Sequence, residues 1–441
     1  MFTPLKLAAG YLIGTYAFFL TAGRAAEVEN LSRLTLFVLA AVSALCIGYV
    51  AQVQRLKRSR PTAERADGPA TPGLVFLCAT YFLILGLAQL NVIGVPSPSE
   101  VAHALTHPGE QYFLQRQFEG EFSRPVQVLT LLAGFYPLLI PLAVLHWSRL
   151  GKLLRCYVIT GIAIYVTYYL SIGVLKGLGD LLITWGASYL LLSATRVGGK
   201  ARHVRIRPWR RAALLTVMTL IFLTYMSFNQ NDRTESSGQP SAIPANPVIA
   251  RIVGDDLASG LAVTLSYPTH GYLGLSYNLS VPFVWTKGIG GSPAIGSYLG
   301  QYTSIDPHFD DRYTARTAEA TGWPDGMYWS TIFPWLASDL SYPGSLAFMA
   351  IVGWFLAKFW IESIRTRRIL SVALFGQLAL LIAFVPANNQ LGQTRPALIA
   401  FVSLAALSLA DRIRRRVAAS AAANEPIRLG PGRHLPRRGS A

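Results

Sequence analysis

The stretch YPTHGYLGLSYNLSVPFVWTKGIGGSP, residues 267–293, is the part of the sequence on which the expected architecture depends. It holds a histidine, three tyrosines, and a lysine followed by a glycine-rich turn, and it lies in the longest interval between clear apolar runs. It is too apolar for a solvated linker, and its glycines and prolines interrupt it too often for an ordinary membrane-spanning helix. Segments of this kind lie at a membrane surface or line a cavity between helices. We therefore expect a membrane protein whose functional site includes these residues.

The composition is that of a membrane protein. The 441 residues are 52% hydrophobic and 14% charged, whereas about 25% charged residues is usual in soluble domains. Apolar runs of about 18–20 residues recur along the chain, which is long enough for helices to cross a bilayer. A net charge of +17 would suggest nucleic-acid binding in a soluble protein. Most basic residues, however, fall in short loops and in the tail, where membrane topology explains them, so no nucleic-acid partner is expected.

Ten apolar stretches are predicted to cross the membrane as helices. They comprise residues 7–21, 34–53, 74–93, 126–146, 157–174, 181–194, 212–228, 343–361, 369–385 and 397–409. Alternate connections between them carry clusters of Lys and Arg, the densest of which is TRVGGKARHVRIRPWRR at residues 195–211. Because short basic loops remain on the cytoplasmic side, both termini are assigned to the cytoplasm.

The predicted fold class is an all-α polytopic membrane protein of about ten transmembrane helices, with a large outer loop between the seventh and the eighth. Four regions follow: helices one to seven, the large extracytoplasmic loop with partly buried helices and the active site, helices eight to ten, and a basic cytoplasmic tail expected to be disordered. Their bounds are residues 1–228, 229–342, 343–416 and 417–441. Within the loop, residues 251–285 are predicted to form one or two helices broken near Pro268 and Pro282.

Charged residues are nearly absent from the predicted spans, which argues against the buried charge relay of a proton-coupled carrier. Charged and aromatic residues gather instead in the segments assigned to the outer face. Several cations there lie close to the membrane, where Arg and Lys can bind the oxygens of a lipid-linked phosphate or diphosphate. The candidate site residues are Lys176, Arg251, His270, Tyr272, Lys287, Arg312, Arg316, Trp323, Trp329, Asp339 and Arg395.

Each candidate also has a structural interpretation. Lys176 and Arg251 each precede an aspartate by four residues and can pair with it. His270 can be held by structural hydrogen bonds, and Arg395 can extend to the lipid headgroups. The loop arginines can pair with neighbouring aspartates, and the tryptophans can form an interfacial belt. The glycines of residues 288–291 allow close approach to a phosphate but lack the ending of a P-loop.

Neither a metal nor a cofactor is expected. The acidic residues of the outer segments are scattered and show no metal-ligand spacing. Cys46, Cys78 and Cys156 fall inside or at the edge of apolar spans, where they are expected to pack as apolar side chains and not to form disulfides or bind metal.

The large outer loop carries several short motifs in a fixed order. These are Tyr267-x-x-His270-Gly271-Tyr272-x-Gly274-Leu275, Gly288-x-Gly290-x-Ser292-Pro293, Gly322-Trp323, and Trp329-Ser330-Thr331 ahead of Asp339 and Gly344. Together with about ten spans and one large outer loop in the second half, this order resembles the bacterial oligosaccharide repeat-unit polymerases of the O-antigen polymerase type. The resemblance covers residues 176–395 loosely and residues 251–344 best.

The resemblance implies a glycosyltransferase of the bacterial inner (plasma) membrane that joins oligosaccharide units carried on undecaprenyl diphosphate at the outer face. The growing glycan on its lipid diphosphate is the donor, and the non-reducing end of a new lipid-linked unit is the acceptor. The implied partners are the lipid-linked oligosaccharide and membrane lipids. A chain-length regulator and a flippase of the same pathway are compatible with this activity.

This chemistry needs cations at the leaving diphosphate, a base at the attacking hydroxyl and aromatic surfaces against the sugars. The cations assigned to the leaving group are Arg251, Lys287 and Arg395, with Arg312 or Arg316 in reserve. The bases considered are His270, ahead of Asp339 or Asp325. The sugar contacts are Tyr272, Trp323 and Trp329, and Lys176 is a further substrate-binding cation.

Three other functions fit parts of the sequence. A ligase-like transferase would move finished glycan from the same lipid to another acceptor, using the same cationic site. A transporter or flippase of lipid-linked oligosaccharide would need a continuous polar path, which the apolar spans argue against. A non-catalytic assembly partner would tolerate substitution of every outer charged residue.

Overall fold

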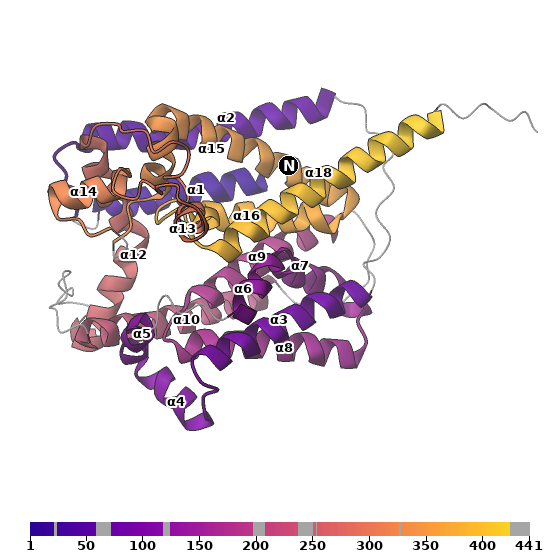
Figure 1. Ribbon diagram of the computed structural model, residues 1–441, viewed down its shortest axis with the longest axis horizontal. Helices are drawn as coiled ribbons and strands as arrows, with labels where there is room; N and C mark the ends of the chain where they lie inside the picture. The colour runs from indigo at the N-terminus through magenta and orange to yellow at the C-terminus, as the bar shows by residue number, and fades with distance from the viewer. Residues whose placement is uncertain are drawn as a thin grey trace, which may run out of the picture.

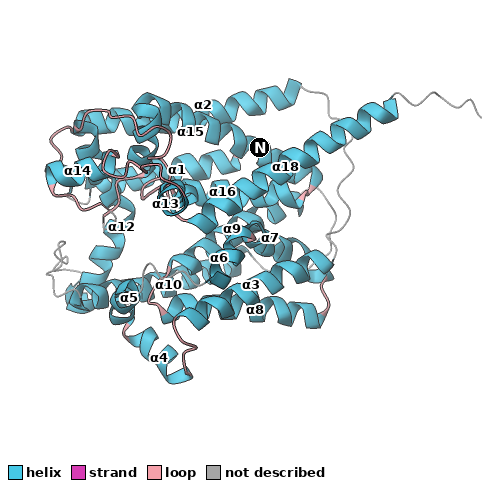
Figure 2. Ribbon diagram, viewed as in Figure 1, coloured by secondary structure: helices cyan, strands magenta, loops and turns pink. Residues whose placement is uncertain are grey.

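The computed structural model describes residues 1–21, 24–58, 72–117, 124–196, 208–236, 250–252, 254–325 and 328–423. Over these residues the regular structure is helical, with no strand (Figure 2). The predicted all-α class is therefore confirmed. The tail was predicted to be disordered over residues 417–441, and this is wrong for residues 417–423, which continue the last helix; residues 424–441 lie outside the described residues.

Seventeen α-helices make up most of the described structure. They are α1 (Thr3–Thr21), α2 (Leu31–Arg58), α3 (Pro72–Val92), α4 (Pro98–Thr106), α5 (Pro108–Gln117), α6 (Arg124–Leu131), α7 (Tyr136–His146), α8 (Lys152–Ser171), α9 (Lys176–Arg196), α10 (Pro208–Ser236), α12 (Asp255–Ser280), α13 (Pro293–Tyr302), α14 (Tyr313–Thr321), α15 (Ile332–Thr366), α16 (Ile369–Ala383), α17 (Gln390–Gln393) and α18 (Arg395–Ala423).

The long helices form two groups that lie next to each other (Figure 1). One group contains α1, α2, α15, α16 and α18, and the other contains α3 and α6 to α10. Contacts of α16 with α7 and α9 join the two groups in the middle, and α12 joins them at one end by packing against α1 and α10. The C-terminal ends of α2 and α18 lie at the opposite end from α12 and α14 (Figure 1); α2 has Arg55, Lys57 and Arg58 in its last turn, and α18 carries Arg412 and Arg414 to Arg416 in its C-terminal half. This distribution is the one that the positive-inside rule predicts.

Six helices of the described part are long and apolar enough to cross a membrane: α2, α3, α8, α9, α15 and α18. A seventh span is obtained if α6 and the segment Ala133–Arg149, which are bent by 57°, cross as one unit. The chain is thus a multi-pass membrane protein by the length and composition of its helices. The other three predicted spans fall on α1, α10 and α16, the last of which has 15 residues. The total of ten spans remains a prediction.

The large predicted loop contains more helix than the sequence suggested. The helix α12 continues through Pro268, where a break was predicted, and ends two residues before Pro282. The prediction of a break at Pro268 is therefore wrong. A proline removes one backbone hydrogen bond, and packing of α12 against α1 and α10 outweighs that loss. Further along, α15 consists of two helical parts separated by Ser341, which has φ 59° and ψ 170°.

Close contacts between small residues hold α2 against α15. A Cβ atom placed on Gly48 would lie 1.8 Å from the carbonyl oxygen of Ala350, and one placed on Gly353 would lie 2.0 Å from that of Leu45. The backbones of the two helices therefore touch without side chains between them. Glycine and alanine at such crossings allow the close van der Waals packing that holds helices together in membranes.

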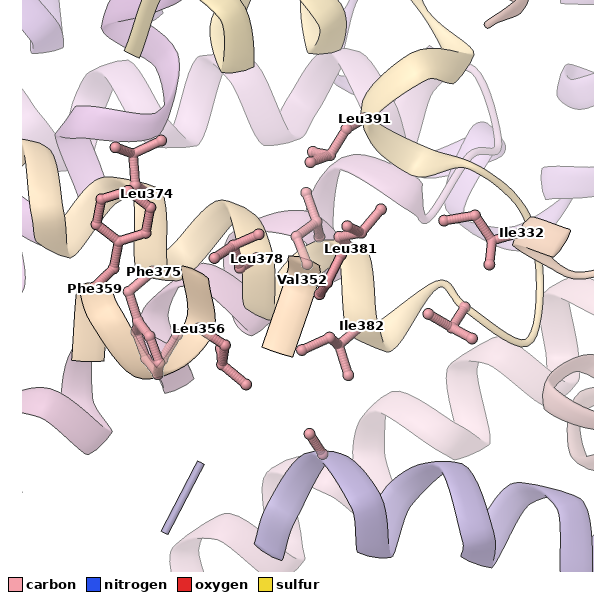
Figure 3. Close-up of a cluster of buried hydrophobic side chains, with 14 of the residues drawn as sticks. Ile332, Val352, Leu356, Phe359, Leu374, Phe375, Leu378, Leu381, Ile382 and Leu391 are labelled. Atoms are coloured by element: carbon pink, nitrogen blue, oxygen red, sulfur yellow. The ribbon is translucent and has the colours of Figure 1, made fainter. Parts of the chain in front are cut away.

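The helix α16 occupies the centre of the molecule, and its residues are buried nearly all the way round. In Figure 3, Phe375 and Leu378 of α16 lie beside Leu356 and Phe359 of α15, within one cluster of apolar side chains. A helix that is apolar on every face requires such surroundings. This packing places the C-terminal end of α16, and the chain that follows it, at the junction of the two helix groups.

Candidate functional site

A cavity of about 1440 Å³ lies at the junction of the two helix groups. Its walls come from α3, α6, α8 and α9 on one side and from α13, α16, α17 and α18 on the other. Pockets for single small ligands usually measure about 300–1,000 Å³. The cavity therefore has room for a ligand larger than one sugar ring.

Positive charge predominates among the side chains that line this cavity in the described part of the chain. The charged lining residues are Arg124, Lys176, Asp180, Arg312 and Arg395. Seven tyrosines and five glutamines add hydroxyl and amide groups, and Leu85, Val92 and Leu131 are among the apolar members. One carboxylate against four cations favours an anionic ligand.

The guanidinium of Arg395 is held in a fixed orientation at the wall. Its Nε donates to the Ser297 hydroxyl at 2.9 Å, and Nη2 donates to the Ser297 carbonyl at 2.8 Å. The guanidinium carbon lies 4.5 Å from the centre of the Tyr298 ring, in cation–π contact. These contacts restrict the long side chain before any ligand binds, which lowers the entropy lost on binding.

Arg312 lies on the loop before α14 and is also fixed. It donates to the Phe309 carbonyl at 2.9 Å and to the Asp325 carboxylate at 3.2 Å, and it packs 5.2 Å from the centre of the Trp335 ring. Burial lowers the pKa of Arg312 from its usual value, and the charge of Asp325 opposes this shift. An arginine remains protonated under such a shift at neutral pH. The predicted ion pairing of the loop arginines is thus confirmed for Arg312, which still lines the cavity.

The third candidate cation, Lys176, is the first residue of α9. Its Nζ lies 3.5 Å from a carboxylate oxygen of Asp180, one turn further along the helix, which confirms the predicted pairing. Asp180 also accepts from the Gln390 amide at 3.3 and 3.4 Å. The side chain of Asp180 is 10% exposed and that of Lys176 is 35% exposed. The pair therefore forms a polar patch in the cavity wall and connects α9 to α17.

Four helices begin at residues that line the cavity. These first residues are Arg124 of α6, Lys176 of α9, Pro293 of α13 and Arg395 of α18. The N-terminal end of a helix carries a partial positive charge and backbone N–H groups without helical partners. The helix ends therefore add to the positive potential produced by the three cationic side chains at these positions.

The glycine-rich turn binds a carboxylate of the protein itself. Gly288 and Gly290 donate their N–H groups to Oδ1 of Asp339 at 2.9 and 3.2 Å, and Gly291 donates to Oδ2 at 2.7 Å. The Thr286 hydroxyl also donates to Oδ1. The turn thus holds Asp339 in place of the phosphate predicted from the sequence. Asp339, considered as a base, is fully engaged as the acceptor that shapes this turn.

Lys287 lies apart from the cavity, although it was assigned to the leaving group. Its side chain is exposed and does not line the cavity, and its backbone has φ 56°. The left-handed backbone follows from the Asp339-centred turn, which requires Lys287 and Gly288 both to adopt positive φ. The sequence showed the turn but not the direction in which its lysine points.

His270 belongs to an aromatic cluster outside the cavity. Its Nε2 accepts from the Trp329 N–H at 3.2 Å, and its ring stacks on Trp329 with centres 5.3 Å apart. Trp323 and Tyr328 pack around it at 6.4 and 6.2 Å. The residue is 8% exposed, so the structural interpretation of His270 is favoured over a role as base. Trp323 and Trp329, proposed as sugar contacts, both pack against this histidine.

Tyr272 packs between helices. It is 1% exposed, its ring contacts Tyr16 and Phe19 of α1, and its hydroxyl lies 2.9 Å from that of Thr15. No surface is left for a sugar, so the predicted sugar contact is replaced by a packing role that connects α1 to α12.

Replacing Tyr272 with phenylalanine tests this role. The change removes the hydrogen bond with Thr15 and keeps the ring, so we expect unchanged activity and a loss of about 1 kcal/mol of folding stability. The checks are the activity of the variant in cells and the melting temperature of the purified protein. A direct sugar contact through the hydroxyl would instead lower activity at unchanged melting temperature.

Two further candidates are also placed away from the cavity lining. Arg316 donates to the carbonyls of Asp311 and Pro282 at 2.9 and 2.8 Å, and so connects the loop before α14 to the segment after α12. Arg251 is exposed on a short helical segment before α12, beside Ile252, which is 77% exposed. Neither side chain can contact a ligand in the cavity as it stands.

Several lining residues were not predicted from the sequence. Gln377, Gln390 and Gln393 line the cavity, as do Arg124 and Tyr298. Polar residues inside or next to an apolar span are costly in a membrane. The positions of the three glutamines could therefore have identified them as candidate lining residues. Arg124 stands at the start of a predicted span, where a cation is ordinary, so its position in the wall was not apparent.

No protein-family model, no curated protein and no solved structure matches this chain.

Proposed function

We propose that this chain is a multispan glycosyltransferase that joins lipid-diphosphate-linked oligosaccharide units into a polysaccharide at the outer face of a bacterial plasma membrane. The observation that carries the proposal is the large cavity between membrane helices, with four cationic side chains and one carboxylate among its described lining residues. A diphosphate leaving group develops negative charge as its bond to the sugar breaks. Fixed cations in a partly dry site stabilise that charge.

Arg395 and Arg312 are the proposed partners of the diphosphate. Both guanidinium groups are oriented by hydrogen bonds and by aromatic rings before a ligand is present. Planar guanidinium groups match pairs of phosphate oxygens, which a lysine cannot do. Arg124 stands at the start of α6 on the opposite wall and adds charge there.

The rest of the wall suits the lipid and the sugars. Val92, Val128 and Leu131 make an apolar part of the cavity wall on α3 and α6, and Val128 and Leu131 are 60% and 66% exposed. Such a surface suits the hydrocarbon next to the diphosphate. Tyr298 and Tyr302 of α13 line the cavity beside Arg395, where their rings can pack against sugar faces.

Deletion of the gene is the direct test of this function. We expect loss of the polymer ladder and accumulation of single lipid-diphosphate-linked units on the outer face of the membrane. Accumulation on the inner face would instead indicate a flippase. A normal ladder that no longer reaches its final acceptor would indicate a ligase-like transferase. Polymer loss combined with tolerance of substitutions at Arg312 and Arg395 would indicate a non-catalytic partner. Polymerase activity is also compatible with a separate chain-length regulator and a separate flippase in the same pathway.

Substitution of the exposed Arg251 tests whether the site is the cavity or includes Arg251, which the sequence assigned to the leaving group. Arg251→Ala is expected to leave the length distribution of surface polysaccharide unchanged, because exposed substitutions away from a site change free energies by about 0.5 kcal/mol or less. A role at the leaving group predicts a loss of about 3 kcal/mol of transition-state stabilisation. Shortened polymer from Arg251→Ala protein present at the normal level would show that Arg251 belongs to the site.

A further inference from the structure

The cavity leaves one candidate for the base. Asp180 is the only carboxylate among its described lining residues. His270 and Asp339, which the sequence suggested, do not line it, and both are engaged in contacts elsewhere. A reaction in the cavity that removes a proton from a hydroxyl therefore has Asp180 as the carboxylate within reach.

The surroundings of Asp180 suit a neutral partner with hydroxyl groups. Lys176 at 3.5 Å balances its charge, so the patch does not attract a cation. Its other observed donor, the Gln390 amide, lies at 3.3 and 3.4 Å, which is long for a hydrogen bond. A carboxylate can accept about four hydrogen bonds. Asp180 therefore retains capacity for an O–H donor.

The neighbouring glutamines point to the same class of ligand. Gln390 is 1% exposed, and its Oε1 is buried without a hydrogen-bond partner among the described residues. Oε1 of Gln393, three residues later in the cavity wall, is in the same state. Both atoms are acceptors, and a buried acceptor without a donor is destabilising. Small shifts of these side chains would let sugar hydroxyls or water supply the donors.

We propose, on the basis of the function proposed above, that Asp180 is the general base that takes the proton from the attacking hydroxyl of the acceptor sugar. The hydroxyl oxygen forms a bond to the anomeric carbon of the donor, and the bond from that carbon to the diphosphate oxygen breaks. The electron pair of the broken bond leaves with the lipid diphosphate, at the cations Arg395 and Arg312. The proton of the hydroxyl ends on Asp180 and passes to solvent before the next addition.

The test uses the full chain in lipid nanodiscs, with single lipid-linked units extracted from cells that lack this protein. Asp180→Asn keeps the shape of the side chain and removes the base. We expect elongation to fall by about 100-fold, at the lower end of general-base effects, while the protein still folds and binding of the lipid-linked unit stays at the wild-type level. Asp306→Asn is the matched control, because its side chain is 74% exposed and outside the cavity.

A second variant separates chemistry from packing. Asp180→Ala leaves space beside Gln390, and formate, a small carboxylate, is expected to restore part of the elongation where chloride at equal concentration does not. Elongation by Asp180→Asn at the wild-type rate, or loss of its binding to the lipid-linked unit, would overturn the assignment. If deletion cells accumulate no lipid-linked units and the wild-type protein forms no polymer, the proposed function fails, which is a different outcome.

Discussion

Arg395→Ala is expected to lower polymer elongation by about 100-fold, equivalent to about 3 kcal/mol of transition-state stabilisation. The guanidinium lies in the wall of the cavity, held by Ser297 and by the Tyr298 ring. It is thus oriented before the diphosphate develops its charge, and a group that needs no reorganisation stabilises a transition state most effectively. The measurement is the length distribution of polysaccharide in cells, followed by the elongation rate of the purified protein.

The lysine variant separates charge from geometry. Arg395→Lys keeps the positive charge but cannot donate twice to Ser297 or stack as a plane on Tyr298. We therefore expect a rate between those of wild type and the alanine variant. Arg365→Ala is the matched control, since this arginine is exposed near the C-terminal end of α15, outside the cavity lining. Wild-type polymer from folded Arg395→Ala protein would remove the residue from the site.

The sequence was sufficient to predict where most long helices lie. The predicted span at residues 34–53 falls inside α2, and the one at residues 74–93 matches α3 except for its last residue, since long apolar runs have few other structures open to them in a membrane. The path of α12 was less predictable because Pro268 normally interrupts a helix, and only contacts with α1 and α10 explain its continuity.

The candidate site was predicted only in part. Lys176, Arg312 and Arg395 are far apart in sequence and meet in one cavity. They were chosen because cations near the outer face of a membrane need partners, and the structure places all three in the wall of one cavity. Lys287 was chosen for a local glycine motif and Asp339 as a possible base, and the two belong to one closed unit in which the glycine turn binds Asp339. A local pattern shows that a group can bind a ligand, but not whether another residue of the protein already occupies that group, as Asp339 occupies the N–H groups of the glycine turn.

The contact between α2 and α15 gives the second large effect. Gly353→Leu is expected to prevent the two helices from packing and to remove most of the folded protein from the membrane. Even the Cβ atom would lie 2.0 Å from the Leu45 carbonyl oxygen and 3.0 Å from the Tyr49 nitrogen, both of them backbone atoms that cannot rotate away. Overpacking in a core that can adjust costs about 1–3 kcal/mol, and here α2 as a whole would have to move.

The same substitution at Gly186 controls for adding a leucine to a membrane helix. Gly186 lies in α9, and a Cβ atom there would meet nothing within 4 Å. We expect Gly186→Leu protein to appear at the wild-type level and to elute as a single species in detergent, whereas Gly353→Leu protein is degraded or aggregates. Because Gly353 does not line the cavity, any folded fraction should elongate polymer at the normal rate per molecule. Normal levels of Gly353→Leu protein would show that the α2–α15 crossing does not hold this bundle together.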